Sequence, residues 1–213
     1  MLAANAIAEF EGNIRTVGMA GLAAIVLAGA WIWPLPPMAH DLFAAHMFQH
    51  LLAMNLAAPL IATALRREAM PLSAVAMLQL AALWIWHTPA VFIAAHNSVV
   101  LQTLMQVSLF GAALLFWMAI LDSRTHPVWH RICTLLASAK IFCLLGATFV
   151  FSRRTLYVTH GNPENWGLTA LEDQQLAGLL MVSSCALIYV AAAIALFARW
   201  LFMISPHAAF AGK

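Results

Sequence analysis

Charged residues are scarce in this sequence. Only 8% of its 213 residues are Asp, Glu, Lys or Arg, whereas such residues make up about 25% of a typical soluble protein. Hydrophobic residues make up 64%, and the mean hydropathy is +0.88. A soluble domain of this length has no interior large enough to bury that much apolar surface. The composition therefore excludes a soluble globular protein and predicts an integral membrane protein.

Several functional signatures are also absent. The basic residues are scattered at segment ends and the net charge is only +2, so we expect no nucleic-acid partner. The three cysteines form no CxxC pair and fall inside apolar segments, which is typical of small buried hydrophobic residues. No P-loop, dinucleotide fingerprint, serine triad or HExxH zinc motif occurs. These absences argue against nucleotide-driven or hydrolytic chemistry, and we do not expect an enzyme.

What the sequence does contain is a series of long apolar runs. A helix needs about 20 residues to cross a bilayer, and a window of that length finds six candidate spans. The breaks between them contain proline or charge, as in "WPLPP", "RREAMP" and "DSRTHPVWHR". The sequence therefore predicts an all-α, polytopic transmembrane helix bundle. Its six spans are expected near residues 15–34, 40–65, 71–95, 98–121, 131–151 and 173–203.

The distribution of basic residues predicts the orientation of the bundle. If the amino terminus is cytoplasmic, most Lys and Arg residues fall on the cytoplasmic side, as the positive-inside rule requires. We therefore expect both termini in the cytoplasm, an interfacial lead-in over residues 1–14, the transmembrane domain over 15–203 and a tail over 204–213. The basic residues on that side are Arg15, Arg66, Arg67, Arg124, Arg131, Arg199 and Lys213.

This orientation places unusual polar residues at one depth, near the outer face of the membrane. His46 and His50, in the segment "HMFQH", lie about one turn apart on one face of the second span, and His87 lies in the third. Ionisable groups inside a membrane are costly and usually face the bundle interior, so we interpret this layer as a candidate site. Its further members, from the fourth and sixth spans, are Gln102, Gln106, Asp173 and Gln174.

The donor types in this layer favour copper over zinc or magnesium. Imidazole binds copper in both oxidation states and thioether selects Cu(I), and Met47 shares part of the helix face of His46 and His50. Two alternatives need the same rings, namely axial haem ligation and a proton or quinone site. The candidate metal ligands are His46, His50, His87, Asp173 and Met47, and the candidate cofactor-binding residues are Gln102, Gln106 and Gln174.

Lys140 lies apart from this layer, in the middle of the fifth span. An ammonium group at that depth needs a carboxylate partner or a path along which its stem can snorkel to the interface. Asp122 is the carboxylate that we consider as its partner. We expect a structural role for Lys140 and no catalytic one.

Three segments of the chain resemble a known family. They begin "HMFQHLLAMN" (46–65), "LWIWHTPAVF" (83–120) and "LEDQQLAGLL" (171–201). In order and spacing as well as in residues, they resemble the CtaG-type cytochrome c oxidase assembly factors of the caa-type oxidase branch. The residues that carry the resemblance are His46, Gln49, His50, Trp86, His87, Pro89, Asp173, Gln174, Gln175 and Gly178.

The resemblance implies a multi-pass protein of the bacterial plasma membrane that helps a haem-copper oxidase mature, with copper handling as the proposed role. Members of this family often carry a His-x-x-x-His pair early in the fourth helix. Here Gln102 and Gln106 occupy those two places, and amide side chains are poor copper ligands. We expect an assembly factor that binds copper transiently, with the lipid bilayer and oxidase subunits or another respiratory complex as partners. The alternatives are an accessory subunit or structural partner of a respiratory complex and a haem- or quinone-binding electron carrier.

Overall fold

The described part of the chain is helical. The computed structural model describes residues 2–65, 70–157 and 161–204, and within these ranges it contains helices and no strand. The all-α prediction is therefore confirmed. The predicted tail from residue 205 onward, together with Arg66 and Arg67 of the basic set, lies outside the described residues.

The helices follow one another along the chain with short connections. They are α1 (Leu2–Trp31), α2 (Leu35–Asp41), α3 (Phe43–Leu51), the π-helix η1 (Leu52–Ala57), α4 (Ala58–Ala64), α5 (Leu72–Trp86), α6 (Pro89–His96), α7 (Val99–Leu121), α8 (Val128–Phe151), the 3-10 helix η2 (Pro163–Trp166) and α9 (Ala170–Ile204).

The helical segments agree with a polytopic bundle of about six spans. Among the described residues, five segments are long and apolar enough to cross a membrane, and there are six if α5 and α6, which are bent by 74° to each other, count as one span. The direction in which the bundle crosses the bilayer stays a prediction. The five unbroken segments are Thr16–Asp41, Phe43–Ala64, Val99–Leu121, Val128–Phe151 and Ala170–Ile204.

Two chain breaks shape the region around the histidines. Leu42 has an extended backbone (φ −119°, ψ 124°) and separates α2 from α3, so His40 lies on α2 and not on the helix of His46 and His50. The second break follows α5, where Thr88 is extended (φ −72°, ψ 135°) before Pro89. Proline disfavours helical backbone in the residue before it and cannot donate a backbone hydrogen bond, which explains the bend after His87.

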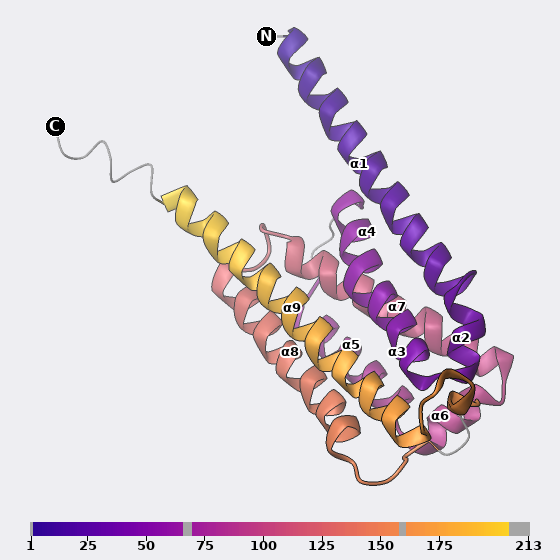
Figure 1. Ribbon diagram of the computed structural model, residues 1–213. Coiled ribbons are helices and arrows are strands. Elements are labelled where there is room, and N and C mark those ends of the chain that lie inside the picture. Colours follow the sequence, from indigo (N-terminus) through magenta and orange to yellow (C-terminus); the bar gives the residue numbers. More distant parts are fainter. Residues whose placement is uncertain (1, 66–69, 158–160, 205–213) are drawn as a thin grey trace.

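The two helices at the carboxyl end, α8 and α9, run side by side along most of their length (Figure 1). Gly146 and Gly178 face each other between them. A Cβ atom added at Gly178 would lie 2.6 Å from the carbonyl oxygen of Gly146, and one added at Gly146 would lie 2.9 Å from that of Gly178. The absence of side chains at these two positions therefore permits the close approach of α8 and α9, as small residues do at many membrane helix interfaces.

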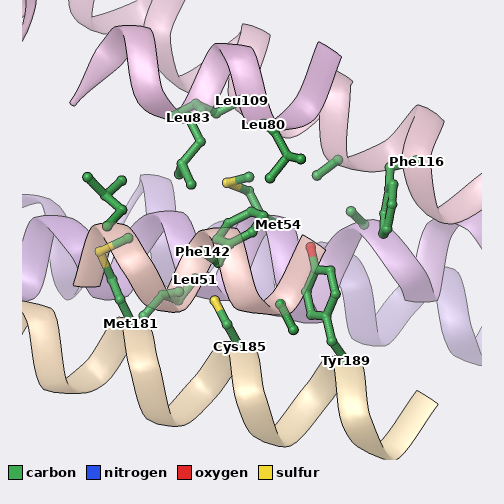
Figure 2. Packing of buried hydrophobic residues seen from close by; sticks show 14 of the residues in the cluster. Leu51, Met54, Leu80, Leu83, Leu109, Phe116, Phe142, Met181, Cys185 and Tyr189 are labelled. Atoms are coloured by element: carbon green, nitrogen blue, oxygen red, sulfur yellow. The ribbon is translucent and has the colours of Figure 1, made fainter. Parts of the chain in front are cut away.

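One large apolar cluster fills the interior between these helices (Figure 2). Met54, Phe142, Met181, Cys185 and Tyr189 lie in it with at most 2% of their surface exposed. Cys185 is thus a buried core residue, as predicted, whereas Cys143 is only partly buried and Cys133 is exposed. The cysteines do not assemble into a site.

The suggested pairing of Lys140 with Asp122 is wrong. Lys140 is exposed on α8. Asp122, buried just after α7, instead accepts hydrogen bonds from the backbone and side-chain nitrogens of Arg124 and from the Thr125 hydroxyl. Asp122 therefore stabilises the turn between α7 and α8, in which it lies.

Candidate functional site

His46 and His50 face each other in the interior of the bundle. Both lie on α3, one turn apart, and each has only 4% of its surface exposed. Their Nε2 atoms are 3.0 Å apart, and their rings are nearly perpendicular, at 89°. At this distance one Nε2 donates a hydrogen bond to the other, so at least one ring presents a lone pair toward its neighbour.

His87 lies beside this pair, at the point where α5 ends. Its ring centroid is 5.9 Å from that of His50. The Nδ1 atom is 2.7 Å from the carbonyl oxygen of Leu83, and because a carbonyl only accepts, Nδ1 must carry the proton. The Nε2 atom therefore holds a lone pair, and this buried atom has no hydrogen-bond partner among the described residues. A backbone hydrogen bond to one ring nitrogen is the arrangement that orients metal-binding histidines.

Aromatic rings enclose the three histidines, which we call the histidine cluster. Phe92 packs edge-on against His46, with centroids 5.3 Å apart, and Phe149 lies 6.4 Å from His87. Tyr157, from the loop after α8, packs on Phe92 and donates a hydrogen bond from its hydroxyl to the carbonyl oxygen of His87. Burial raises the pKa of Tyr157, so the hydroxyl keeps its proton and remains a donor. These rings exclude water from the histidine cluster on this side.

Asp173 reaches the same region from α9, but it binds backbone rather than imidazole. Its two carboxylate oxygens accept hydrogen bonds from the backbone nitrogens of Phe43 (2.7 Å) and Ala44 (2.9 Å). These are the first residues of α3, whose own N-cap residue is the apolar Leu42 and supplies no side-chain acceptor. A carboxylate at this place satisfies the orphan donors and the positive end of the helix dipole. Asp173 therefore fixes the start of the helix that carries His46 and His50.

Two further predicted site residues, Gln174 and Met47, make contacts that stabilise the fold. Gln174 accepts a hydrogen bond from the Leu156 backbone nitrogen (2.6 Å) and donates to the carbonyl oxygens of Phe149 and Arg154. It thus holds the chain that leaves α8 against the start of α9. Met47 has 1% of its surface exposed and belongs to the apolar cluster of the interior.

Gln102 and Gln106 line a polar cavity of about 490 Å³ beside the histidine cluster, which we call the glutamine pocket. The side-chain amide oxygen of Gln106 accepts a hydrogen bond from the indole nitrogen of Trp31 (3.0 Å), and the side chain of Gln106 lies next to His50. Gln106 thus forms the boundary between the pocket and the cluster. The described lining consists of Trp31, Pro36, Ala39, His40, Gln49, His96, Gln102, Thr103, Gln106 and Val107.

Two more histidines border the glutamine pocket. His40 on α2 and His96 at the end of α6 have ring centroids 5.8 Å apart. His40 is exposed and His96 half-buried. The glutamine pocket therefore has the imidazole rings of His40 and His96 near the protein surface, and that of His50 lies on the other side of Gln106.

Some features of the site gave no clear signal in the sequence. Tyr157 and Phe92 are ordinary aromatic residues in the sequence, and only the fold brings them to the histidines. Gln49, which donates to the carbonyl oxygen of Ala30 (2.7 Å), stands between the two histidines of "HMFQH" and was a visible candidate. The π-helix η1 begins two residues after His50. Such π-turns are frequent at functional sites, but no residue pattern announced this one.

The donor set suits a metal ion but does not form a closed cage. Two atoms bound to one ion at about 2.0 Å can lie at most about 4 Å apart, so the 3.0 Å separation of the His46 and His50 Nε2 atoms allows a shared ion. Within the described ranges, no three His, Cys, Asp or Glu side chains are placed to hold one ion together. The arrangement is therefore a histidine pair with a third, oriented imidazole nearby.

The fold and the site define a multi-pass helical membrane protein with a buried histidine cluster next to a polar pocket. Residues 66–202 match the family model described as cytochrome c oxidase caa3 assembly factor (Caa3_CtaG). The match spans more than half of the chain, and the protein belongs to this family. No curated protein and no solved structure matches the chain significantly.

The family match confirms the resemblance found in the sequence. It contains two of the three quoted segments, 83–120 and 171–201, and with them His87, Asp173 and the glutamines. The matched range begins after residue 65, so the segment with His46 and His50 precedes it. Family membership therefore assigns the protein to cytochrome c oxidase assembly. His46 and His50 lie outside the matched range, so the description of this pair rests on the structure alone.

Proposed function

We propose that this assembly factor binds a copper ion transiently at His46 and His50 and passes it to a cytochrome c oxidase subunit. The observation that carries the proposal is the facing pair of Nε2 atoms, 3.0 Å apart in a buried interior. Copper is the cargo of the protein in this account. Imidazole binds copper well in both oxidation states, and oxidase assembly requires a supply of that metal.

His87 completes the proposed binding site as a third donor. Its proton is held on Nδ1 by Leu83, so Nε2 is already deprotonated for a metal. Because the ring centroids of His50 and His87 are 5.9 Å apart, a small ring movement is enough for His87 to join or leave the ion. Two permanent ligands and one adjustable ligand suit a site that must release its cargo.

The other predicted ligands receive supporting roles in this proposal. Both oxygens of Asp173 are used by the backbone of α3, so Asp173 positions the histidine pair instead of binding the ion. Met47 lines the interior next to His46 and offers a thioether to Cu(I). Gln102 and Gln106 line the route between the outer end of the bundle and His50.

The glutamine pocket supplies a path for the ion. His40 and His96 stand near its surface, and Gln106 separates its interior from His50. Because amide side chains are poor copper ligands, Gln102 and Gln106 line this path without holding the ion, and the imidazoles at its two ends bind it. The recipient oxidase subunit would dock where this pocket opens. We place the protein in the bacterial plasma membrane with this pocket on the outer side.

The first experiment is metal analysis with a visible spectrum on protein purified from copper-supplemented cells. We expect copper at a fixed ratio to protein and no Soret band. The double variant His46→Ala/His50→Ala should lose most of this copper, and a strain that carries it should accumulate less mature oxidase. His130→Ala is the matched control, because His130 is exposed on α8 away from the site. Copper retained by the double variant would contradict the proposal, and a Soret band would favour the haem-binding alternative.

A further inference from the structure

His40 and His96 stand at the surface end of the glutamine pocket, and we call them the mouth pair. His40 lies in the last turn of α2 and His96 ends α6, and Figure 1 shows both helices at the same end of the bundle. The side chain of His40 is 79% exposed and His96 is half-buried, whereas His46 and His50 are buried. The mouth pair is therefore accessible from solvent.

The spacing of the mouth pair fits two imidazoles bound to one metal ion. An ion about 2.0 Å from a ring nitrogen lies about 3 Å from the centre of that ring, so two rings on one ion have centres roughly 4.5–6 Å apart. The centroids of His40 and His96 are 5.8 Å apart, which falls inside this range. Because the His40 side chain is exposed, its ring can turn toward a shared ion without displacing packed neighbours.

The fold directs His40 to this place. Leu42 is extended and separates α2 from α3, so His40 is not part of the helix that carries His46. The chain that follows α8 also holds the end of α2, because Gly161 has a positive φ of +47° and a Cβ atom there would lie 2.3 Å from the backbone of Asp41. Only glycine permits so close a contact. The position of His40 is thus set by packed backbone.

The other groups at the mouth are oxygen donors. The Asp41 carboxylate lies 3.7 Å from Nδ1 of His40 and adds negative charge beside the place of the ion, and the Gln102 amide lines the pocket. The described lining contains neither Met nor Cys. Within the described ranges no third His, Cys, Asp or Glu side chain completes a closed metal site, so water takes the remaining positions on the ion. Nitrogen and oxygen donors in open geometry suit Cu(II).

We propose that the mouth pair is a second metal site, which binds a hydrated Cu(II) ion between His40 and His96. The combination of two imidazoles at ligand spacing, a neighbouring carboxylate and access from water carries this inference. Binding at the mouth pair does not depend on His46 and His50. Its role as the place where copper enters or leaves the glutamine pocket rests on the function proposed above.

The two sites differ in how firmly they hold the ion. With two protein ligands and the rest water, the mouth pair exchanges its ion with solvent, so copper bound there is washed out in metal-free buffer. The buried pair is enclosed by aromatic rings and keeps its ion through purification. Copper that survives purification therefore reports on the buried pair, and Cu(II) added afterwards reports on the mouth pair as well.

The test titrates Cu(II) into copper-free protein in detergent, purified without a polyhistidine tag, and follows the ion by electron paramagnetic resonance and by the relaxation of water protons. In the His46→Ala/His50→Ala variant we expect one water-accessible Cu(II) ion with the signal of two imidazoles. Adding His40→Ala should weaken its binding at least about tenfold, since loss of even an outer-sphere partner costs a metal site that much. His40 is exposed, so this change should not disturb folding. His40→Ala alone should weaken the water-accessible signal of the wild type in the same way.

His130→Ala is the matched control, because His130 is exposed on α8, and it should bind Cu(II) at the mouth pair as the parent does. Millimolar Mg²⁺ should not compete, since it prefers carboxylate and water to imidazole. The proposal is overturned if His40→Ala has no effect, if His130→Ala weakens binding as much, or if Mg²⁺ displaces the Cu(II).

The outcome also separates this proposal from the function proposed above. A folded His46→Ala/His50→Ala variant that binds no Cu(II) would overturn the second site and leave the buried site standing. Cu(II) bound to that variant, together with wild-type protein that keeps no copper through purification, would support the second site and reject the buried one.

Discussion

The chemistry of the site depends on where three imidazole rings place their protons. The carbonyl oxygen of Leu83 fixes the proton of His87 on Nδ1. Between His46 and His50, one Nε2 atom donates a hydrogen bond and the other accepts it with its lone pair. Buried polar atoms without partners are costly, and the Nε2 atom of His87 has no hydrogen-bond partner among the described residues. In the copper proposal this lone pair is the third donor to the ion.

Replacement of Asp173 separates a positioning role from a ligand role. Because both its oxygens cap α3, Asp173→Asn should lower the free energy of unfolding by about 1 kcal/mol. Copper stoichiometry at saturating copper should not change, since the ion is bound elsewhere. Thermal unfolding in detergent and metal analysis of the same samples measure the two effects.

Glu164→Gln is the control for Asp173→Asn, because Glu164 is an exposed acidic residue in η2. It should change neither stability nor copper content. A folded Asp173→Asn variant with no copper would show instead that the carboxylate is a ligand.

Asp122 gives a pH-dependent prediction. Burial alone would raise the pKa of Asp122, but hydrogen bonds from Arg124 and Thr125 outweigh it and hold this pKa below its usual value. The ionised carboxylate therefore stabilises the folded state above the unfolded pKa of about 3.9, and this contribution is lost as the pH falls through the folded pKa. Arg124 is largely exposed, so we expect only about 1 kcal/mol. Asp122→Asn should destabilise the protein at pH 7, and its unfolding curve should converge with that of the wild type as the pH falls below the lowered pKa of the folded state.

The helices bring the functional residues together through their interruptions. The break at Leu42 starts α3 where Asp173 can cap it, and the bend before Pro89 leaves His87 at the end of α5, facing α3. The π-helix η1 then changes the register of the second span directly after His50. Unbroken helices over the predicted spans would not have brought the capping carboxylate and the histidines together in this arrangement.

The close contact between α8 and α9 predicts the effect of replacing Gly178. A Cβ at Gly178 meets the backbone of Gly146 at 2.6 Å, and backbone cannot move aside without separating the helices. Gly178→Ala should therefore destabilise the protein by about 1–3 kcal/mol. Gly111→Ala is the control, because a Cβ at Gly111 in α7 meets nothing within 4 Å.

In a helix interior alanine is favoured over glycine by roughly 0.5–1 kcal/mol. The control Gly111→Ala should thus be neutral or stabilising, while Gly178→Ala lowers the midpoint of thermal unfolding in detergent. Equal midpoints for the two variants would contradict the close packing of α8 on α9.

Composition and apolar run length were enough to predict the whole-molecule architecture. A helix needs about 20 predominantly apolar residues to cross a bilayer, so the candidate spans appeared close to where the structure has apolar helices. The polar layer was also found, because polar residues in apolar runs are conspicuous. The partner of Asp173 was not predictable, because nothing local in the sequence shows that it binds the start of α3, about 130 residues away. The contact of Asp122 with Arg124 is different: it is local, two residues along the chain, and the sequence already offered it as a nearer partner than Lys140.

X-ray absorption spectroscopy of the copper-loaded protein tests whether His46 and His50 bind the ion. It reports the atoms bound to copper, whatever the recipient oxidase. For wild-type protein we predict two or three nitrogen donors at about 2.0 Å with the outer scattering pattern of imidazole, and loss of that pattern in His46→Ala/His50→Ala but not in His130→Ala. A spectrum dominated by sulfur, or an imidazole pattern that persists in the double variant, would contradict the account.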